Sequence, residues 1–177
     1  NWARIIAQSV YYFYCYFLVE DHKQPINFSV PTGNFGDVYA GYLAKKLGLP
    51  INKLIVATNQ NDILHRAISE GKYEAAHVSE TISPSMDIQV ASNFERLIYD
   101  LNDHDCSQTL EDMKNIKQNG QYIINNEKLK KINKDFLSAR MSEQETLNVI
   151  KNINEKFNIV LDPHTAIGYG AFDKHNL

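Results

Sequence analysis

Apolar and polar residues change spacing several times along this chain, and each change marks a predicted element. Residues 1–19 carry apolar side chains at three- and four-residue intervals, with tyrosines between them, so the stretch predicts a helix that is apolar on nearly all sides. We expect such a helix to lie in the core of a larger body. Residues 25–30 form a short apolar-rich run typical of a buried strand, and helical spacing resumes from Val38 to Leu47.

A second unit of the same kind follows. Residues 53–57 form another apolar run, a polar stretch covers 58–62, and the next helix places Ile63, Leu64, Ala67 and Ile68 on one face. Strand, helix, strand and helix with short joints predict an α/β fold with a parallel sheet and right-handed crossovers.

The second half of the chain is more polar. It predicts a helix through Phe94 and Leu101, then short outer helices at 110–117 and 127–132 within the polar stretch 102–133. A capping box at 142–145 opens an amphipathic helix.

The end of the chain returns to apolar residues. It predicts a third short strand at 159–161 and a final helix that Gly168 and Gly170 break. We therefore divide the chain into an α/β part at 1–100, a mostly helical outer segment at 101–157, and a returning strand, turn and helix at 158–177.

The loop between the first strand and its helix, Thr32-Gly33-Asn34-Phe35-Gly36-Asp37, is the first candidate site. Such a loop can aim several backbone N–H groups at one point, and the helix N-terminus adds its positive dipole end, which suits a phosphate. It is neither a dinucleotide fingerprint, which needs glycine where Phe35 stands, nor a Walker A loop. The alternative is an ordinary strand-to-helix turn with glycines chosen for positive φ. The carboxyl ends of parallel strands, where ligands sit in such sheets, favour the anion site.

Composition narrows the function classes. The 177 residues suffice for one domain, and a net charge of −3 without a basic block predicts neither a nucleic-acid partner nor a membrane partner. Two cysteines form no disulfide framework and no metal-ligand pair, so a reducing, cytoplasmic setting is expected. The apolar run 10–19 is too short to span a membrane, and no signal peptide is evident. Because the chain opens in mid-helix without Met, we expect it to be part of a longer protein.

Several stretches together resemble one enzyme family. The stretches are Asn1-Trp2-Ala3-Arg4-Ile5, the loop with Val30 and Pro31, 57–64, 83–88 with 92–96, and Leu161-Asp162-Pro163-His164-Thr165-Ala166-Ile167-Gly168. In this order they resemble the threonine synthases, in particular the longer bacterial and fungal branch. The resemblance covers nearly the whole chain.

The resemblance implies the parallel-sheet portion of a type II (tryptophan-synthase-β-like) pyridoxal-phosphate fold, here with a helical polar segment. It implies the cofactor pyridoxal 5'-phosphate and the conversion of O-phospho-L-homoserine and water to L-threonine and phosphate. By matching position, the residues that bind the cofactor phosphate are Gly33, Asn34, Phe35 and Gly36, with Asp37 adjoining.

The resemblance also implies that two elements of the chemistry lie outside this chain. The Schiff-base lysine of the family belongs to a segment before Asn1, and the hydroxyl partner of the pyridine nitrogen to a segment after Leu177. Lys134 matches a different part of the family, so no catalytic residue is assigned here. We expect this chain alone to be inactive and to need the remaining part of its own polypeptide, and assembly into a homo-oligomer is left open.

A second set of residues is expected around the substrate or just behind it. The set consists of Asn59, Asn61, Asp87, Asn93, Arg96 and His164. For Arg96 the alternatives are a phosphate partner and a salt bridge on a helix surface.

Two other functions remain open. One is another type II pyridoxal-phosphate lyase, such as a serine or threonine dehydratase. The other is a non-catalytic module that binds a phosphate ligand or a protein.

Overall fold

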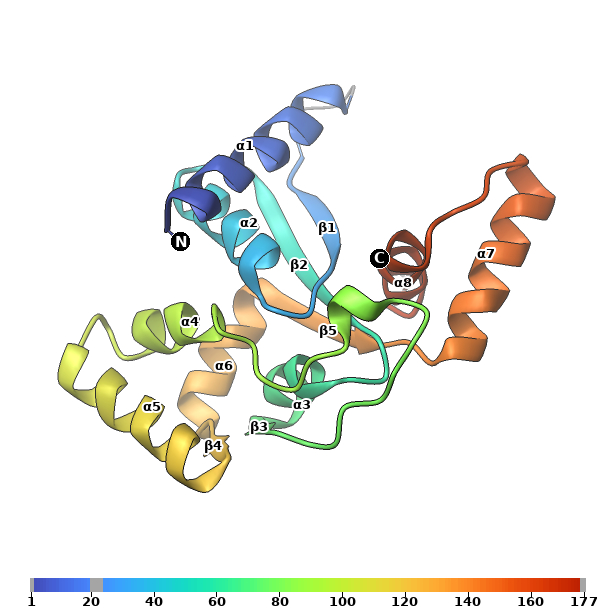
Figure 1. Ribbon diagram of the computed structural model, residues 1–177. Coiled ribbons are helices and arrows are strands. Elements are labelled where there is room, and N and C mark those ends of the chain that lie inside the picture. Colours follow the sequence, from blue (N-terminus) through green and yellow to red (C-terminus); the bar gives the residue numbers. More distant parts are fainter. Residues whose placement is uncertain (1, 20–23, 176–177) are drawn as a thin grey trace.

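A three-stranded parallel sheet forms the centre of the molecule (Figure 1). The computed structural model describes residues 2–19 and 24–175. The strands lie in the order β1 (Ile26–Pro31), β2 (Ile51–Thr58), β5 (Phe136–Arg140). Val56 of the central strand is level with Val30 on one side and with Ser138 on the other, so the three strands end at one edge of the sheet.

The central strand separates two hydrophobic cores. Leu54 and Val56 point into the larger core, and Ile55 and Ala57 point into a smaller one on the opposite face. Because both faces are covered, the strand is apolar at consecutive positions rather than at alternating ones. Helix α8 (Pro163–Asp173) covers the smaller core with Ile167 and Ala171.

The remaining elements surround this sheet. Helices α1 (Trp2–Leu18), α2 (Gly36–Lys46), α3 (Ile63–Glu70), α4 (Phe94–Leu101) and α6 (Asn126–Asp135) contribute to the larger core. The other elements are η1 (Pro84–Met86), α5 (Cys106–Asn119), α7 (Glu143–Phe157) and the antiparallel pair β3 (Lys72–Glu74) and β4 (Gln121–Ile123).

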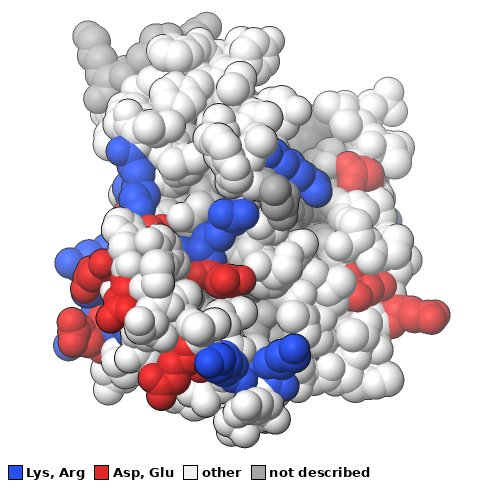
Figure 2. Space-filling view, turned by 60° about the vertical axis from the view of Figure 1, so that its left-hand side comes forward, with Lys and Arg blue, Asp and Glu red and all other residues white. Residues whose placement is uncertain are grey.

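Helix α1 is buried on one side only. Its buried residues are Ile5, Ser9, Tyr12 and Tyr16, whereas Trp2, Tyr14 and Phe17 are each about two-thirds exposed. The upper part of the molecule in Figure 2, where Figure 1 places α1, shows few charged side chains. The expectation of a helix buried all round is thus wrong for the described part of the chain.

The third strand is not where the sequence predicted it. Residues 159–161 form no strand, and Val160 is 76% exposed. The strand that completes the sheet is β5, which follows α6 directly and lies inside the segment 101–157 that we expected to be mostly helical. Its sequence Phe-Leu-Ser-Ala-Arg is short and has two polar residues among five, so it lacks the apolar run on which the prediction relied.

Helix α8 is continuous, so the prediction that Gly168 and Gly170 break it is wrong. Both glycines instead permit close packing. A Cβ at Gly168 would lie 3.1 Å from Pro31 of β1, and one at Gly170 would collide with Met141. The helix therefore lies close against the sheet.

Other predictions are confirmed. The polar stretch forms α5 and α6, and the capping box at Ser142 and Glu145 opens α7.

Among the described helices, none is long and apolar enough to cross a membrane.

Helices α1 and α2 touch through Gly41. A Cβ at this position would lie 2.5 Å from Cε1 of Tyr12 and 2.9 Å from Cδ2 of Leu54. We expect Gly41→Ala to lower the free energy of unfolding by about 1–3 kcal/mol through overpacking, although alanine is favoured over glycine in a helix by about 1 kcal/mol. Urea unfolding measures the change.

The matched control is the same exchange in a Tyr12→Leu background. Removing the ring leaves space for the methyl group, so Gly41→Ala should cost less than half as much there. An equal cost in both backgrounds would contradict the contact.

Candidate anion-binding site

The loop between β1 and α2 lies in a cavity of about 210 Å³ at the carboxyl edge of the sheet. The cavity is lined by Thr32, Gly33, Asn34, Gly36 and Asp37 of the loop and helix start, by Arg4, Ile5 and Gln8 of α1, by Pro31, by Ser85 and Met86 of η1, and by Asn93 and His164. Segments from four parts of the chain thus meet around the predicted loop.

Several backbone N–H groups of the loop and of the start of α2 have no acceptor in the part of the chain that the structure describes. Helix α2 begins at Gly36, and no acceptor among the described residues takes the N–H groups of Gly33, Asn34, Gly36, Asp37 or Val38. The first N–H groups of a helix have no partner within the helix, so they are satisfied from outside. Four of these residues, Gly33, Asn34, Gly36 and Asp37, line the cavity, and their unpaired donors suit the oxygens of an anion.

Phe35 gives the loop its shape. Its φ of 63° is left-handed, its side chain is fully buried against Phe94 and Phe136, and its N–H donates to Oγ1 of Thr32 at 3.2 Å. Left-handed backbone is costly for a residue with a Cβ, so the packed ring holds a turn that sequence rules would assign to glycine. Of the residues predicted to bind phosphate, Phe35 therefore lies in the core with its N–H already engaged.

The two loop glycines allow the loop to pack closely against neighbouring segments. The structure gives neither of them a left-handed φ, contrary to the alternative reading from the sequence. A Cβ on Gly33 would lie 3.0 Å from Cα of Met86 and 3.2 Å from the carbonyl oxygen of Ser85, and one on Gly36 would lie 3.2 Å from Nδ2 of Asn93. The loop can therefore lie directly against the segments that form the opposite wall.

Asn34 and Asn93 join the loop to the start of α4. Oδ1 of Asn34 accepts from N and Oγ of Ser92, at 2.5 and 2.9 Å, and its carbonyl oxygen accepts from Nδ2 of Asn93 at 3.2 Å. Nε of Arg96 donates to Oδ1 of Asn93 at 3.2 Å. Arg96 itself lines a neighbouring cavity of about 540 Å³ together with Tyr39, Tyr99 and Asp100.

Asn59, Asn61 and Asp87 lie outside the cavity lining. Nδ2 of Asn59 lies 2.8–2.9 Å from Thr81, Ser83 and Asp87, and Nδ2 of Asn61 donates to Asp87 at 2.9 Å. These buried bonds fasten the segment before η1 to the end of β2. The three residues, predicted to lie around the substrate or just behind it, thus support the cavity wall from behind.

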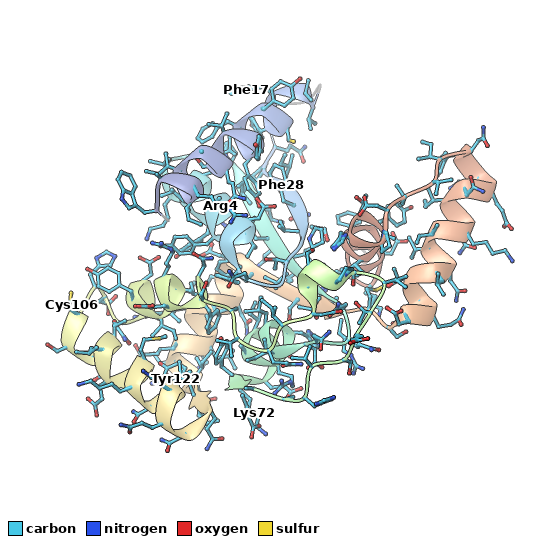
Figure 3. The ribbon with its side chains drawn as sticks, viewed as in Figure 1. Arg4, Phe17, Phe28, Lys72, Cys106 and Tyr122 are labelled. Carbon is cyan, nitrogen blue, oxygen red and sulfur yellow. The ribbon has the colours of Figure 1, made fainter. Side chains whose placement is uncertain are left out.

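The charged side chains of the cavity come from α1 and α2. Burial raises the pKa of the Asp37 carboxyl, while the Tyr12 hydroxyl and the Arg4 guanidinium act in the opposite direction. Figure 3 shows Arg4 on the side of α1 that faces α2. One cation thus offsets the one carboxylate, and the backbone donors remain for a ligand.

Sequence reasoning missed Arg4, Gln8 and Ser85. The two α1 residues stand four positions apart on a helix that is otherwise nearly all apolar, and that spacing could have marked a polar stripe. Oε1 of Gln8 is buried and has no hydrogen-bond partner in the described chain. Ser85 lies in the stretch 83–88 that carries the family resemblance, but no role was assigned to it, because its place in the cavity depends on the buried network around Asn59.

Known proteins resemble this chain in sequence. It is 44% identical to the threonine synthase of Pseudomonas aeruginosa over 171 residues and 43% identical to that of Saccharomyces cerevisiae over 190 residues. These matches cover 97% and 98% of the chain but only 36% and 37% of the relatives' own lengths. No protein-family model matches the chain.

Solved structures agree. The pyridoxal-phosphate-bound threonine synthase of Brucella melitensis superposes with a TM-score of 0.95 at 44% identity, over 98% of this chain and 38% of that one. Maize serine racemase, with a TM-score of 0.56 at 14% identity over 95% of this chain and 42% of that one, shares the fold alone. The resemblance to the threonine synthases and the predicted type II fold are confirmed.

The network behind the wall gives a prediction. Asn59→Leu keeps the size of the side chain but removes its bonds and leaves the Asp87 carboxylate short of donors, so we expect a loss of about 2–4 kcal/mol in the free energy of unfolding. Denaturant unfolding followed by tryptophan fluorescence or circular dichroism checks it.

Asn115→Leu is the control, because Asn115 is exposed on α5. A change within about 0.5 kcal/mol is expected there. If both variants unfold alike, the bonds of Asn59 do not stabilise the wall.

Proposed function

We propose that this chain is the part of a threonine synthase that binds the phosphate group of pyridoxal 5'-phosphate. The whole enzyme would convert O-phospho-L-homoserine and water to L-threonine and phosphate. The observation that carries the proposal is the row of unpaired backbone donors on Gly33, Asn34, Gly36 and Asp37, within a chain more than 40% identical to threonine synthases.

The size and the donors of the cavity fit this group. Gly33 and Gly36 add no side chain of their own to the cavity that they line, so a phosphate can approach their backbone N–H groups closely. The first turn of α2 adds its dipole, and Arg4 adds a positive charge within the same cavity. Nδ2 of Asn34 is a further donor at the rim, since only its Oδ1 is engaged by Ser92.

Gln8 suits a ligand that carries a hydrogen-bond donor in addition to its phosphate group. Its unpartnered Oε1 is buried at the cavity wall, where leaving an acceptor unsatisfied costs about 1–3 kcal/mol. A donor group on the bound molecule would remove that cost. Gln8 thus extends the proposed site from the phosphate loop toward α1.

Pyridoxal phosphate supplies an electron sink for carbanions formed at the substrate. The residues of this chain bind and orient: the loop fixes the phosphate, and the Asn34–Asn93–Arg96 chain of hydrogen bonds fixes the loop against α4. In this proposal the lysine that holds the cofactor comes from outside the chain, as the family resemblance implies. That Asn93 and Arg96 lie around the substrate or just behind it remains a prediction. The cytoplasmic location also remains a prediction, made from the composition of the chain.

The other pyridoxal-phosphate lyases are less well supported. The serine racemase likeness lies at 14–15% identity, whereas identity to the threonine synthases of Pseudomonas aeruginosa and Saccharomyces cerevisiae exceeds 40%. The non-catalytic alternative would still use the same anion cavity, so activity of the full-length protein separates it from the enzyme.

The first test is phosphate release from O-phospho-L-homoserine. We expect the full-length protein with pyridoxal phosphate to release phosphate and to form threonine, and this chain alone to release none. Full-length protein that binds the cofactor but consumes only serine or threonine would favour a dehydratase.

The second test uses a substitution that adds a methyl group to the loop beside the cavity. Gly33→Ala places a methyl group against Met86 and Ser85, at an overpacking cost of about 1–3 kcal/mol, so we expect the dissociation constant of pyridoxal phosphate to rise about tenfold or more in the full-length protein. Equilibrium dialysis measures it.

Gly120→Ala is the control for a destabilising exchange away from the cavity, since its φ of 69° is strained for alanine, a Cβ there meets nothing within 4 Å, and the residue lies at the end of α5. It should leave the affinity for the cofactor unchanged. Equal affinities in the Gly33→Ala variant and the wild type would contradict the proposed position of the phosphate.

A further inference from the structure

Two side chains from segments far apart in the sequence meet at the mouth of the cavity. Oγ of Ser85 lies 2.6 Å from Nε2 of His164, and both residues line the cavity with Gly33 and Gly36. Ser85 belongs to η1, and His164 to the first turn of α8. The cavity thus has a polar wall opposite the loop.

Ser85 is held close to the loop. Its carbonyl oxygen is one of the atoms nearest to Gly33, and the next residue, Met86, is 2% exposed. The segment before η1 is fastened by Asp87, which accepts from Thr81 N at 2.8 Å and from Asn59 at 2.8 Å. The backbone of Ser85 is therefore held in place, and its hydroxyl starts from a defined position beside the unpaired loop donors.

His164 is oriented from the other side. Its Nδ1 lies 3.3 Å from Oδ1 of Asp162, the N-cap of α8, which also accepts from the backbone N–H of His164 at 2.9 Å. This contact holds one edge of the imidazole ring against Asp162. Nε2 is left to interact with Ser85.

The order of these groups suits a phosphate. When Nε2 of His164 donates to Oγ of Ser85, the Ser85 hydroxyl is free to donate into the cavity. The other charged groups of the cavity are Arg4 and Asp37, on the side of α1 and α2. Hydrogen bonds to charged groups are the stronger ones, so a phosphate oxygen is the preferred acceptor.

We propose that Ser85 binds the phosphate group of the cofactor directly and that His164 is a positioning residue that acts through Ser85. The inference rests on the proposed function, since it takes the ligand of the cavity to be pyridoxal phosphate. It adds a side-chain contact from η1 and α8 to the backbone contacts of the loop.

The test compares pyridoxal phosphate with pyridoxal, which lacks the phosphate, by equilibrium dialysis against the full-length apoprotein. Ser85→Ala should weaken the binding of pyridoxal phosphate about tenfold or more, as for a lost hydrogen bond to a charged group, and leave that of pyridoxal unchanged. Ser85 is exposed, so the variant should fold. Equal loss for both ligands, or no loss for either, would overturn the direct contact.

His164 variants separate positioning from direct binding. His164→Ala should weaken the binding of pyridoxal phosphate, and His164→Gln, which keeps an N–H near the place of Nε2, should restore part of the affinity. The Ser85→Ala/His164→Ala double variant should bind no worse than Ser85→Ala. Additive losses would overturn the positioning role.

The outcome for the wild type keeps the two proposals apart. If the wild-type protein binds no pyridoxal phosphate, the proposed function fails. If it binds pyridoxal phosphate and the Ser85 and His164 variants bind it equally well, only this inference fails.

Discussion

The backbone N–H groups at the start of α2 are the constraint around which this structure is organised. Donors that point into a cavity without acceptors are costly unless a ligand or water satisfies them. The surrounding structure preserves them: Phe35 takes the strained turn, Gly33 and Gly36 admit the opposite wall, and Asn34 fixes the loop to α4 through Ser92. None of these interactions fills the cavity. The loop is thus held in place by protein contacts on one side and lines the cavity on the other, as a binding site requires.

The parallel sheet brings the remaining walls to the loop. The polar residues after β2 and the turn before α8 lie near the ends of the same three strands, although they are far apart in sequence. Helix α8 can reach the loop because its two glycines let it lie close against β1 and against Met141, the residue after β5. The glycines that seemed to interrupt this helix therefore set the distance between its first turn and the cavity.

Sequence reasoning predicted the parts of the fold that have local signals. The run 53–57, the β1–loop–α2 unit and the capping box of α7 each combine spacing with a terminal residue of known preference, and the structure confirms them. It failed for β5 and for residues 159–161, because pairing beside β2 decides which short segment becomes a strand, and apolar character alone does not. The outer face of α1 was predicted to be buried for the same reason: an apolar pattern does not identify the protein surface that covers it.

The asparagines show where prediction from residue type ends. Asn34, Asn59, Asn61 and Asn93 all follow strands or precede helices near one edge of the sheet. The family resemblance assigns Asn34 to the cofactor phosphate and the other three to the substrate or the residues just behind it. In the structure the amide groups of Asn59 and Asn61 donate hydrogen bonds to partners from 79–87, whereas Asn34 and Asn93 line the cavity. Their roles differ because the segment 79–93 passes behind the first pair and beside the second. That path, fixed by Asp87 and by the buried Met86, separates these similar polar residues into two that support the cavity wall and two that line the cavity.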